Sequence, residues 1–119
     1  MQQYLLNIIQ PERSTPSRDE LRTIMTDVEM LDAEMRDAGV LVFSGGLHAP
    51  NTSTVFEPRE DDVDTREGPY DASTGQLGGL VVIQAPDSTE ALEWARRLAV
   101  ATTQPVEVRA FQNEGDRVR

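Results

Sequence analysis

The single histidine of the chain, His48, lies in the segment Gly45-Gly46-Leu47-His48-Ala49-Pro50. Glycines allow the backbone to approach another group closely, and Pro50 stiffens the end of the segment. Because an imidazole gains and loses a proton near neutral pH, His48 is suited to general acid–base catalysis. The alternative interpretation is a loop histidine that only hydrogen-bonds to the backbone.

A turn-rich stretch, Thr65–Gly79, contains the carboxylate that we expect to work with this histidine. Gly68-Pro69 and Gly78-Gly79 predict two bends in it. We expect Glu67, between the bends and the preceding strand, to orient the imidazole of His48. These two residues are therefore the predicted catalytic residues, and a solvated acidic loop is the competing interpretation.

Three further residues of this stretch are the predicted substrate-binding groups: Arg66, Tyr70 and Asp71. A guanidinium holds a carboxylate through two parallel hydrogen bonds, so we predict a small anionic ligand. Tyr70 follows Pro69 and can donate its hydroxyl into a pocket. Alternatives stay open for each group. Arg66 could instead pair with a neighbouring carboxylate, and Tyr70 could pack at the edge of the core. Asp64 or Asp71 could stand in place of Glu67 beside the histidine.

The composition excludes several kinds of site. The chain of 119 residues has no Cys and one His, so a disulfide framework, a thiolate nucleophile and a zinc–thiolate site are excluded. The carboxylates lack the spacing of a known metal site, so we expect neither a metal nor a cofactor. The run Gly75-Gln76-Leu77-Gly78-Gly79 precedes a strand and lacks Lys, and it therefore does not match a phosphate-binding loop.

The charge balance limits the partners. There are 21 acidic and 11 basic residues, which gives a formal net charge of −10. Nucleic acid and anionic membranes both bind basic surfaces, so we expect neither as a partner. The apolar runs are too short to span a bilayer and the start of the chain has no charged leader, so we expect a cytoplasmic protein.

The hydrophobic pattern predicts the elements that position these residues. We expect strands over residues 4–9, 40–44, 52–56, 80–85 and 106–111, with a short edge strand over 63–66. Helices begin at Ser17 and Asp87, each with a Glu three residues later as in a capping box. The stripe predicted to be buried in the first helix consists of Leu21, Ile24, Met25, Val28, Leu31, Met35 and Ala38.

This order predicts an α+β sandwich in which both helices cover one face of the sheet. Strands such as Leu80–Ile83 are apolar on both faces, so the second face must also be covered. We therefore predict a homodimer that packs through the sheet faces. Residues 1–111 form one predicted domain, and residues 112–119 form a predicted disordered tail.

Several segments, in this order, resemble a known family. They are Gly46-Leu47-His48 followed by Pro50, Glu67-Gly68-Pro69-Tyr70, Gln76-Leu77-Gly78-Gly79, Glu90-Ala91-Leu92-Glu93-Trp94-Ala95 and Val106-Glu107-Val108-Arg109. The set resembles the YCII-related proteins, in the branch named for its Asp-Gly-Pro-Phe motif (DGPF), from Tyr4 to Phe111. The resemblance implies a ferredoxin-like fold, a dimeric α/β barrel, and a cleft for which a His–Asp pair is proposed as catalytic.

The resemblance leaves three functions open. The first is a YCII-like protein with a small-molecule cleft at Thr65–Gly79 and His48. The second is an acid–base lyase or isomerase, similar to dehydrochlorinases, that acts on a small organic acid. The third is a non-catalytic regulatory module, because some relatives occur beside extracytoplasmic-function sigma factors. Here Ala72, Thr74 and Gly75 stand where the branch has charged residues, which motivates the third.

Overall fold

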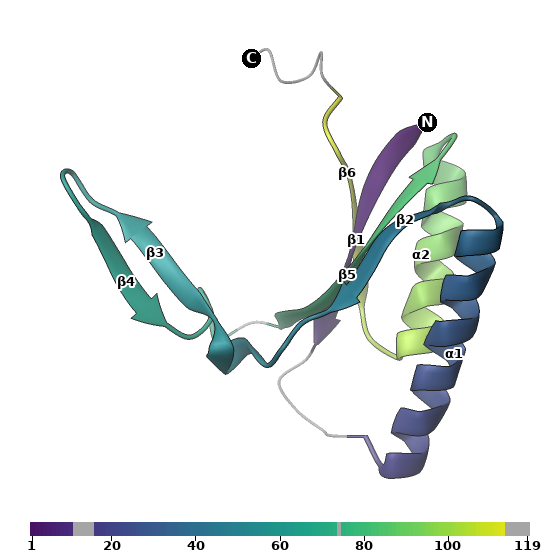
Figure 1. Cartoon of the computed structure of the whole chain (residues 1–119), viewed down its shortest axis with the longest axis horizontal. Coiled ribbons are helices and arrows are strands. Elements are labelled where there is room, and N and C mark those ends of the chain that lie inside the picture. Colours follow the sequence, from purple (N-terminus) through teal and green to yellow (C-terminus); the bar gives the residue numbers. More distant parts are fainter. Residues whose placement is uncertain (11–15, 74, 114–119) are drawn as a thin grey trace.

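A computed structural model describes residues 1–10, 16–73 and 75–113. The predicted disordered tail lies outside the described residues from residue 114 onward. The elements, in chain order, are β1 (Gln2–Gln10), α1 (Arg18–Asp37), β2 (Leu41–Gly46), the 3-10 helix η1 (Pro50–Thr52), β3 (Thr54–Pro58), β4 (Val63–Glu67), β5 (Gln76–Ala85), α2 (Ser88–Thr102) and β6 (Val106–Ala110) (Figure 1).

The main sheet has four antiparallel strands in the order β2-β5-β1-β6. Both helices lie on the same face of this sheet (Figure 1). This arrangement confirms the predicted α+β, ferredoxin-like sandwich. The sheet is open, since β2 and β6 are its two edges, and one chain by itself therefore does not form a closed barrel.

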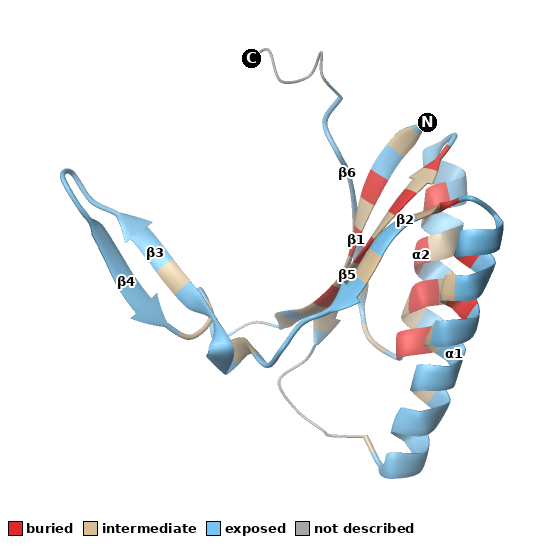
Figure 2. Ribbon diagram, viewed as in Figure 1, coloured by how far each residue is buried: buried red, intermediate tan, exposed pale blue. Residues whose placement is uncertain are grey.

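The core lies between the sheet and the helices (Figure 2). Alternation along β5 shows the reason: Val81 and Ile83 face the helices and are buried, whereas Leu80 and Val82 face the other side and are only half-buried. The buried apolar residues are Tyr4, Leu6, Leu31, Met35, Val40, Val81, Ile83, Ala85, Ala91, Ala95, Leu98 and Ala101.

Helix α1 begins at the capping box that the sequence predicts. The Ser17 hydroxyl accepts from the Glu20 amide at 3.1 Å, and the Glu20 carboxylate accepts from the Ser17 amide at 3.0 Å. The predicted burial of the stripe is wrong in the first half of the helix, where Leu21 and Met25 are 46% and 56% exposed. The reason is that this half extends beyond the end of the sheet, where the layers no longer face one another (Figure 1).

Strands β3 and β4 form a separate two-stranded ribbon, which we call the arm (residues 54–67). Their register runs from Thr54 paired with Glu67 to Pro58 paired with Val63. The short strand predicted over 63–66 is confirmed, but it pairs with β3 and is not an edge strand of the main sheet. The arm projects from the sheet on the side opposite the helices (Figure 1).

The predicted loop Thr65–Gly79 is shorter than expected. Its first residues belong to β4, and Gln76 onward belongs to β5, because β1 is long enough to pair as far as Gln10 with Gln76. The connection that remains is residues 68–75, of which residue 74 is outside the described part of the chain.

Candidate functional site

All five predicted site residues lie where the arm joins the main sheet. We call these two joining segments, residues 47–53 and 66–73, the arm base. The Gly68 amide donates to the Ser53 carbonyl at 2.8 Å, and the Leu47 amide donates to the Gly78 carbonyl at 2.9 Å. The first bond ties the two segments of the arm base to each other, and the second ties the arm base to β5.

Arg66 organises the turn that follows β4. Its guanidinium donates to the carbonyls of Pro69 and Tyr70, both at 3.0 Å, and lies 5.8 Å from the centre of the Tyr70 ring. Its Nε makes a longer contact of 3.4 Å with the Glu57 carboxylate. Gly68 has φ +97°, a conformation that a side chain would disfavour. Arg66 therefore holds a tight turn, and its longest contact is the one to a carboxylate.

Tyr70 and Asp71 take different roles in this turn. The Tyr70 side chain is 75% exposed, so it does not pack at the edge of the core. The Asp71 carboxylate accepts from the hydroxyl of Ser73 at 2.6 Å and from its amide at 2.9 Å. These two bonds, with the hydroxyl first, lower the pKa of Asp71 below its ordinary 3.8. Asp71 is therefore a carboxylate held within its own turn.

The two predicted catalytic residues, His48 and Glu67, are both exposed. His48 lies between β2 and η1, and Glu67 is the last residue of β4. Among the described residues, no hydrogen bond and no ion pair within 4.0 Å joins them or engages the imidazole of His48. The structure thus brings both residues to the arm base but does not show them as a bonded acid–base pair.

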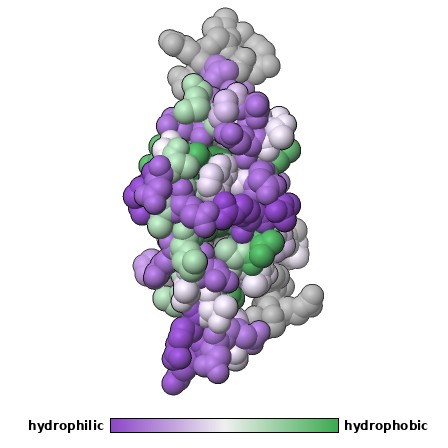
Figure 3. Space-filling model, turned by 90° about the vertical axis from the view of Figure 1, so that its right-hand side faces the viewer, coloured by the Kyte–Doolittle hydropathy of each residue, from purple (hydrophilic) through white to green (hydrophobic). Residues whose placement is uncertain are grey.

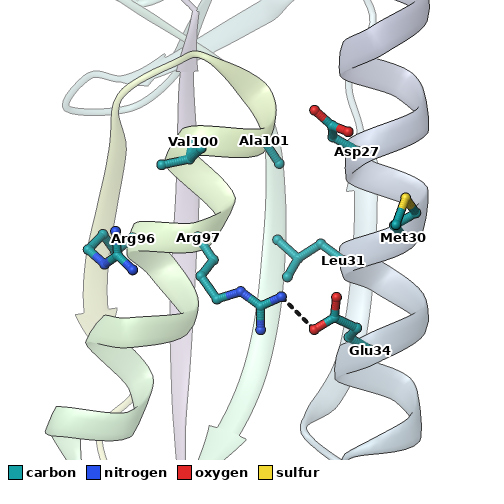
Figure 4. A pocket seen from close by; sticks show the side chains of 8 residues that line it. All are labelled: Asp27, Met30, Leu31, Glu34, Arg96, Arg97, Val100 and Ala101. Carbon is teal, nitrogen blue, oxygen red and sulfur yellow. Dashed lines mark hydrogen bonds and ion pairs between the residues drawn. The ribbon is translucent and has the colours of Figure 1, made fainter.

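A hollow of about 280 Å³ lies elsewhere, between the two helices (Figure 4). Arg97 reaches across it to form an ion pair with Glu34, and its guanidinium lies 5.0 Å from the Trp94 ring. None of the predicted site residues lines this hollow, whose lining is Asp27, Met30, Leu31, Glu34, Arg96, Arg97, Val100 and Ala101.

Sequence reasoning missed this hollow because its walls come from two helices that only the packing brings together. Arg96 is also paired, with Glu93 at 2.8 Å, so both arginines of the hollow already have carboxylate partners. The helical side of the molecule is mostly hydrophilic, with small hydrophobic areas between (Figure 3).

In residues 1–10, 16–73 and 75–113, no three His, Cys, Asp or Glu side chains are placed to hold a metal ion together. No helix within the same ranges is both long enough and apolar enough to cross a membrane.

Comparison with known proteins identifies the family. The family model described as the YCII-related domain matches residues 2–112. No curated protein matches the chain. The match covers every helix and strand described above, and the four-stranded sheet with two helices on one face is the fold that the resemblance implied. The chain belongs to the YCII-related domain family.

Proposed function

We propose that this chain is a ligand-binding protein of the YCII-related family, with a site for a small organic acid at the arm base. The observation that carries the proposal is the pair of hydrogen bonds that the Arg66 guanidinium donates to the carbonyls of Pro69 and Tyr70. These two bonds present the guanidinium in a fixed orientation. His48, whose imidazole forms no hydrogen bond with a described residue, lies in the other segment of the arm base.

A carboxylate ligand would take the place of the longest contact of Arg66. Its Nε approaches Glu57 only at 3.4 Å, and both side chains are about half exposed. A ligand carboxylate can replace Glu57 there without disturbing the two bonds to the backbone carbonyls. His48 would supply the second hydrogen bond, and the exposed ring of Tyr70 an apolar surface.

Binding is better supported than acid–base catalysis. A histidine that acts as a general base needs a partner that orients its ring, and His48 has no such bond to Glu67. Asp71 is already occupied by Ser73. Binding without turnover is also what a regulatory module requires, whereas a lyase or isomerase would need the ligand to bring His48 and a carboxylate together.

The sole histidine makes the test direct, because the protein has one imidazole to observe by NMR. We expect acetate, lactate or succinate to shift the signals of His48 and of the Arg66 Nε–H in a saturable way. The indole signal of Trp94, on α2, serves as the remote control. His48→Gln and Arg66→Gln should each abolish saturation, and the absence of any saturable shift in the unaltered protein would refute the site.

Turnover distinguishes the enzymatic alternative. Lactones and chlorinated organic acids incubated with the protein should be recovered unchanged by mass spectrometry. Conversion that is lost in His48→Ala would show that the protein is an acid–base enzyme and that binding alone is the wrong description.

We also propose that the chain forms a homodimer through the open face of the main sheet. On this face Leu5, Leu80 and Val82 are half-buried and Phe43 is 58% exposed. Register places Val82 between Leu5 and Phe43, so the three form one continuous row. An apolar sheet face needs a covering layer, and a second copy supplies an identical one about a two-fold axis.

Sedimentation tests the dimer. We expect twice the mass of the chain at micromolar concentration. Phe43→Ser should weaken association at least tenfold, because it replaces a large exposed aromatic side chain of this face by a small polar one. Leu92→Ser, at a similarly exposed position on α2, should leave association unchanged. A stable monomer of the unaltered chain would refute the dimer.

A further inference from the structure

The arm is an unusual element for one chain to carry alone. Its strands pair with each other, and neither makes substantial contact with a helix or with a strand of the main sheet. Every residue of the arm is exposed except Val55, which is half-buried. An isolated two-stranded ribbon is at best marginally stable in water. A further surface is therefore needed to hold the arm.

The two faces of the arm differ in chemistry. The register pairs Phe56 with Thr65 and Pro58 with Val63, so these four side chains share one face. This face is largely uncharged, and its Phe56 and Val63 are 66% and 49% exposed. It is an apolar surface that no described part of its own chain covers.

The charged side chains of the opposite face largely pair with one another. The face carries Glu57, Asp64 and Arg66, and the ion pairs Arg66–Glu57 and Arg59–Asp64 neutralise most of its charge. This face has less need of a partner than the face of Phe56 and Val63.

The tip of the arm is acidic. Glu60, Asp61 and Asp62 follow one another there, all exposed, and the neighbouring cation, Arg59, is already paired with Asp64. The arm thus presents an apolar face that ends in unneutralised negative charge. A matching surface must combine exposed apolar side chains with unpaired cations, which are scarce in a chain of net charge −10.

The start of α1 offers that combination. A shallow hollow of about 370 Å³ there is lined by Arg18, Leu21, Arg22, Met25, Thr26 and Glu29. Leu21 and Met25 are about half exposed because this part of the helix extends beyond the sheet. Arg18 and Arg22 form no ion pair with any described residue. Even with Glu29, the hollow is positive on balance.

We propose that the arm of one copy docks on the start of α1 of a second copy. The carboxylates of the tip meet Arg18 and Arg22, and the face of Phe56 and Val63 covers Leu21 and Met25. Within one chain the arm points away from the helices, so the contact must be made between chains (Figure 1).

The dimensions allow this contact in the dimer proposed above, on which the inference rests. Sheets packed face to face lie about 10 Å apart, and the arm with its tip is roughly 20 Å long at about 3.3 Å per residue. An arm that leaves on the open side of its own sheet can therefore pass the end of the partner's sheet and reach the partner's helical layer. Two-fold symmetry forms the contact twice, so each arm and each α1 is used.

Charge exchange tests the docking. Arg22→Glu and Asp61→Arg should each weaken dimerisation about tenfold or more in sedimentation at low salt, and the two together in one chain should restore it. Arg36→Glu, exposed near the other end of α1, is the matched control and should have no effect. Circular dichroism checks that each variant folds. Unchanged dimerisation of both single variants would overturn the docking while leaving the sheet-face dimer intact.

Engineered cysteines locate the contact, since the natural chain has none. Under mild oxidation, a chain carrying both Val63→Cys and Met25→Cys keeps every charge of the contact and should form covalent dimers, with residues 63 and 25 of different chains found linked by peptide mass spectrometry. A chain with Val63→Cys and Val100→Cys, the latter exposed on α2, should not form a link between these residues. Absence of the 63–25 link in a protein that sediments as a dimer would overturn the docking, and a monomer would refute the underlying dimer as well.

Discussion

Arg66 and Tyr70 hold each other across the turn that follows β4. The guanidinium of Arg66 donates to the Tyr70 carbonyl at 3.0 Å and lies 5.8 Å from the centre of the same residue's ring. A second hydrogen bond of equal length joins the same guanidinium to the Pro69 carbonyl, so two of its nitrogens hold the turn. The end of the arm and the candidate binding groups are thereby one local unit.

The first prediction concerns this unit. Arg66→Gln removes the guanidinium that donates to the Pro69 and Tyr70 carbonyls. We therefore expect the backbone NMR order parameters of Tyr70 and Asp71 to fall below about 0.6, the range of flexible segments. The free energy of unfolding should change by no more than about 1 kcal/mol, because the bonds are exposed. Arg109→Gln, at another exposed arginine, is the control. Unchanged order parameters would show that the turn holds without Arg66.

The second prediction concerns the backbone of the arm base. A Cβ would meet open space at both Gly68 and Gly46, but Gly68 has φ +97° whereas the φ of Gly46 is not in the left-handed region. Gly68→Ala should cost the arm about 1 kcal/mol, which corresponds to roughly fivefold faster hydrogen exchange of the β3–β4 amides. Gly46→Ala should leave that exchange unchanged. Equal exchange in the two variants would mean that the arm tolerates a side chain at Gly68.

The third prediction is a pH dependence. The pKa of Asp71 is lowered, so its bonds to Ser73 favour the charged carboxylate. Their contribution to the turn is present above the ordinary value of 3.8 and is lost as the pH falls below it. Ser73→Ala keeps the amide but removes the hydroxyl, and the pKa of Asp71 should rise toward 3.8 in a carboxyl ¹³C NMR titration. Ser53→Ala should not move it; a Ser73→Ala titration identical to wild type would contradict the assignment.

The fourth prediction concerns the core. Leu98 is fully buried on α2, so Leu98→Ala should lower the free energy of unfolding by about 2 to 5 kcal/mol. Val100, on the same helix, is 68% exposed, and Val100→Ala should change it by less than about 0.5 kcal/mol. Urea denaturation measures both. Similar costs for the two variants would mean that the helix is packed differently.

Structural features that depend on a few neighbouring residues could be predicted from the sequence alone. The Ser17–Glu20 capping box and the Asp87 cap, whose carboxylate accepts from the Glu90 amide, depend only on neighbours in the chain. Alternation and helical periodicity likewise predicted the order of strands and helices, and with it the α+β sandwich.

Helical periodicity could not show where the core ends. Leu21 and Met25 continue the apolar stripe of Leu31 and Met35, but only the latter two have the sheet beneath them. A pattern reports which side of a helix is apolar, whereas burial depends on how far the facing layer extends.

The path of the arm was also beyond local signals. The strands around Phe56 and Val63 were predictable from the sequence. Their separation from the main sheet was not, because it depends on which edge of the sheet the chain leaves and on the long β1–β5 ladder that begins at Gln76. His48 and Glu67 could likewise be proposed from residue type alone, without knowledge of how they lie relative to each other. Whether they bond is decided by the three-dimensional course of two segments, since the interaction of side chains far apart in sequence depends on distance and not on composition.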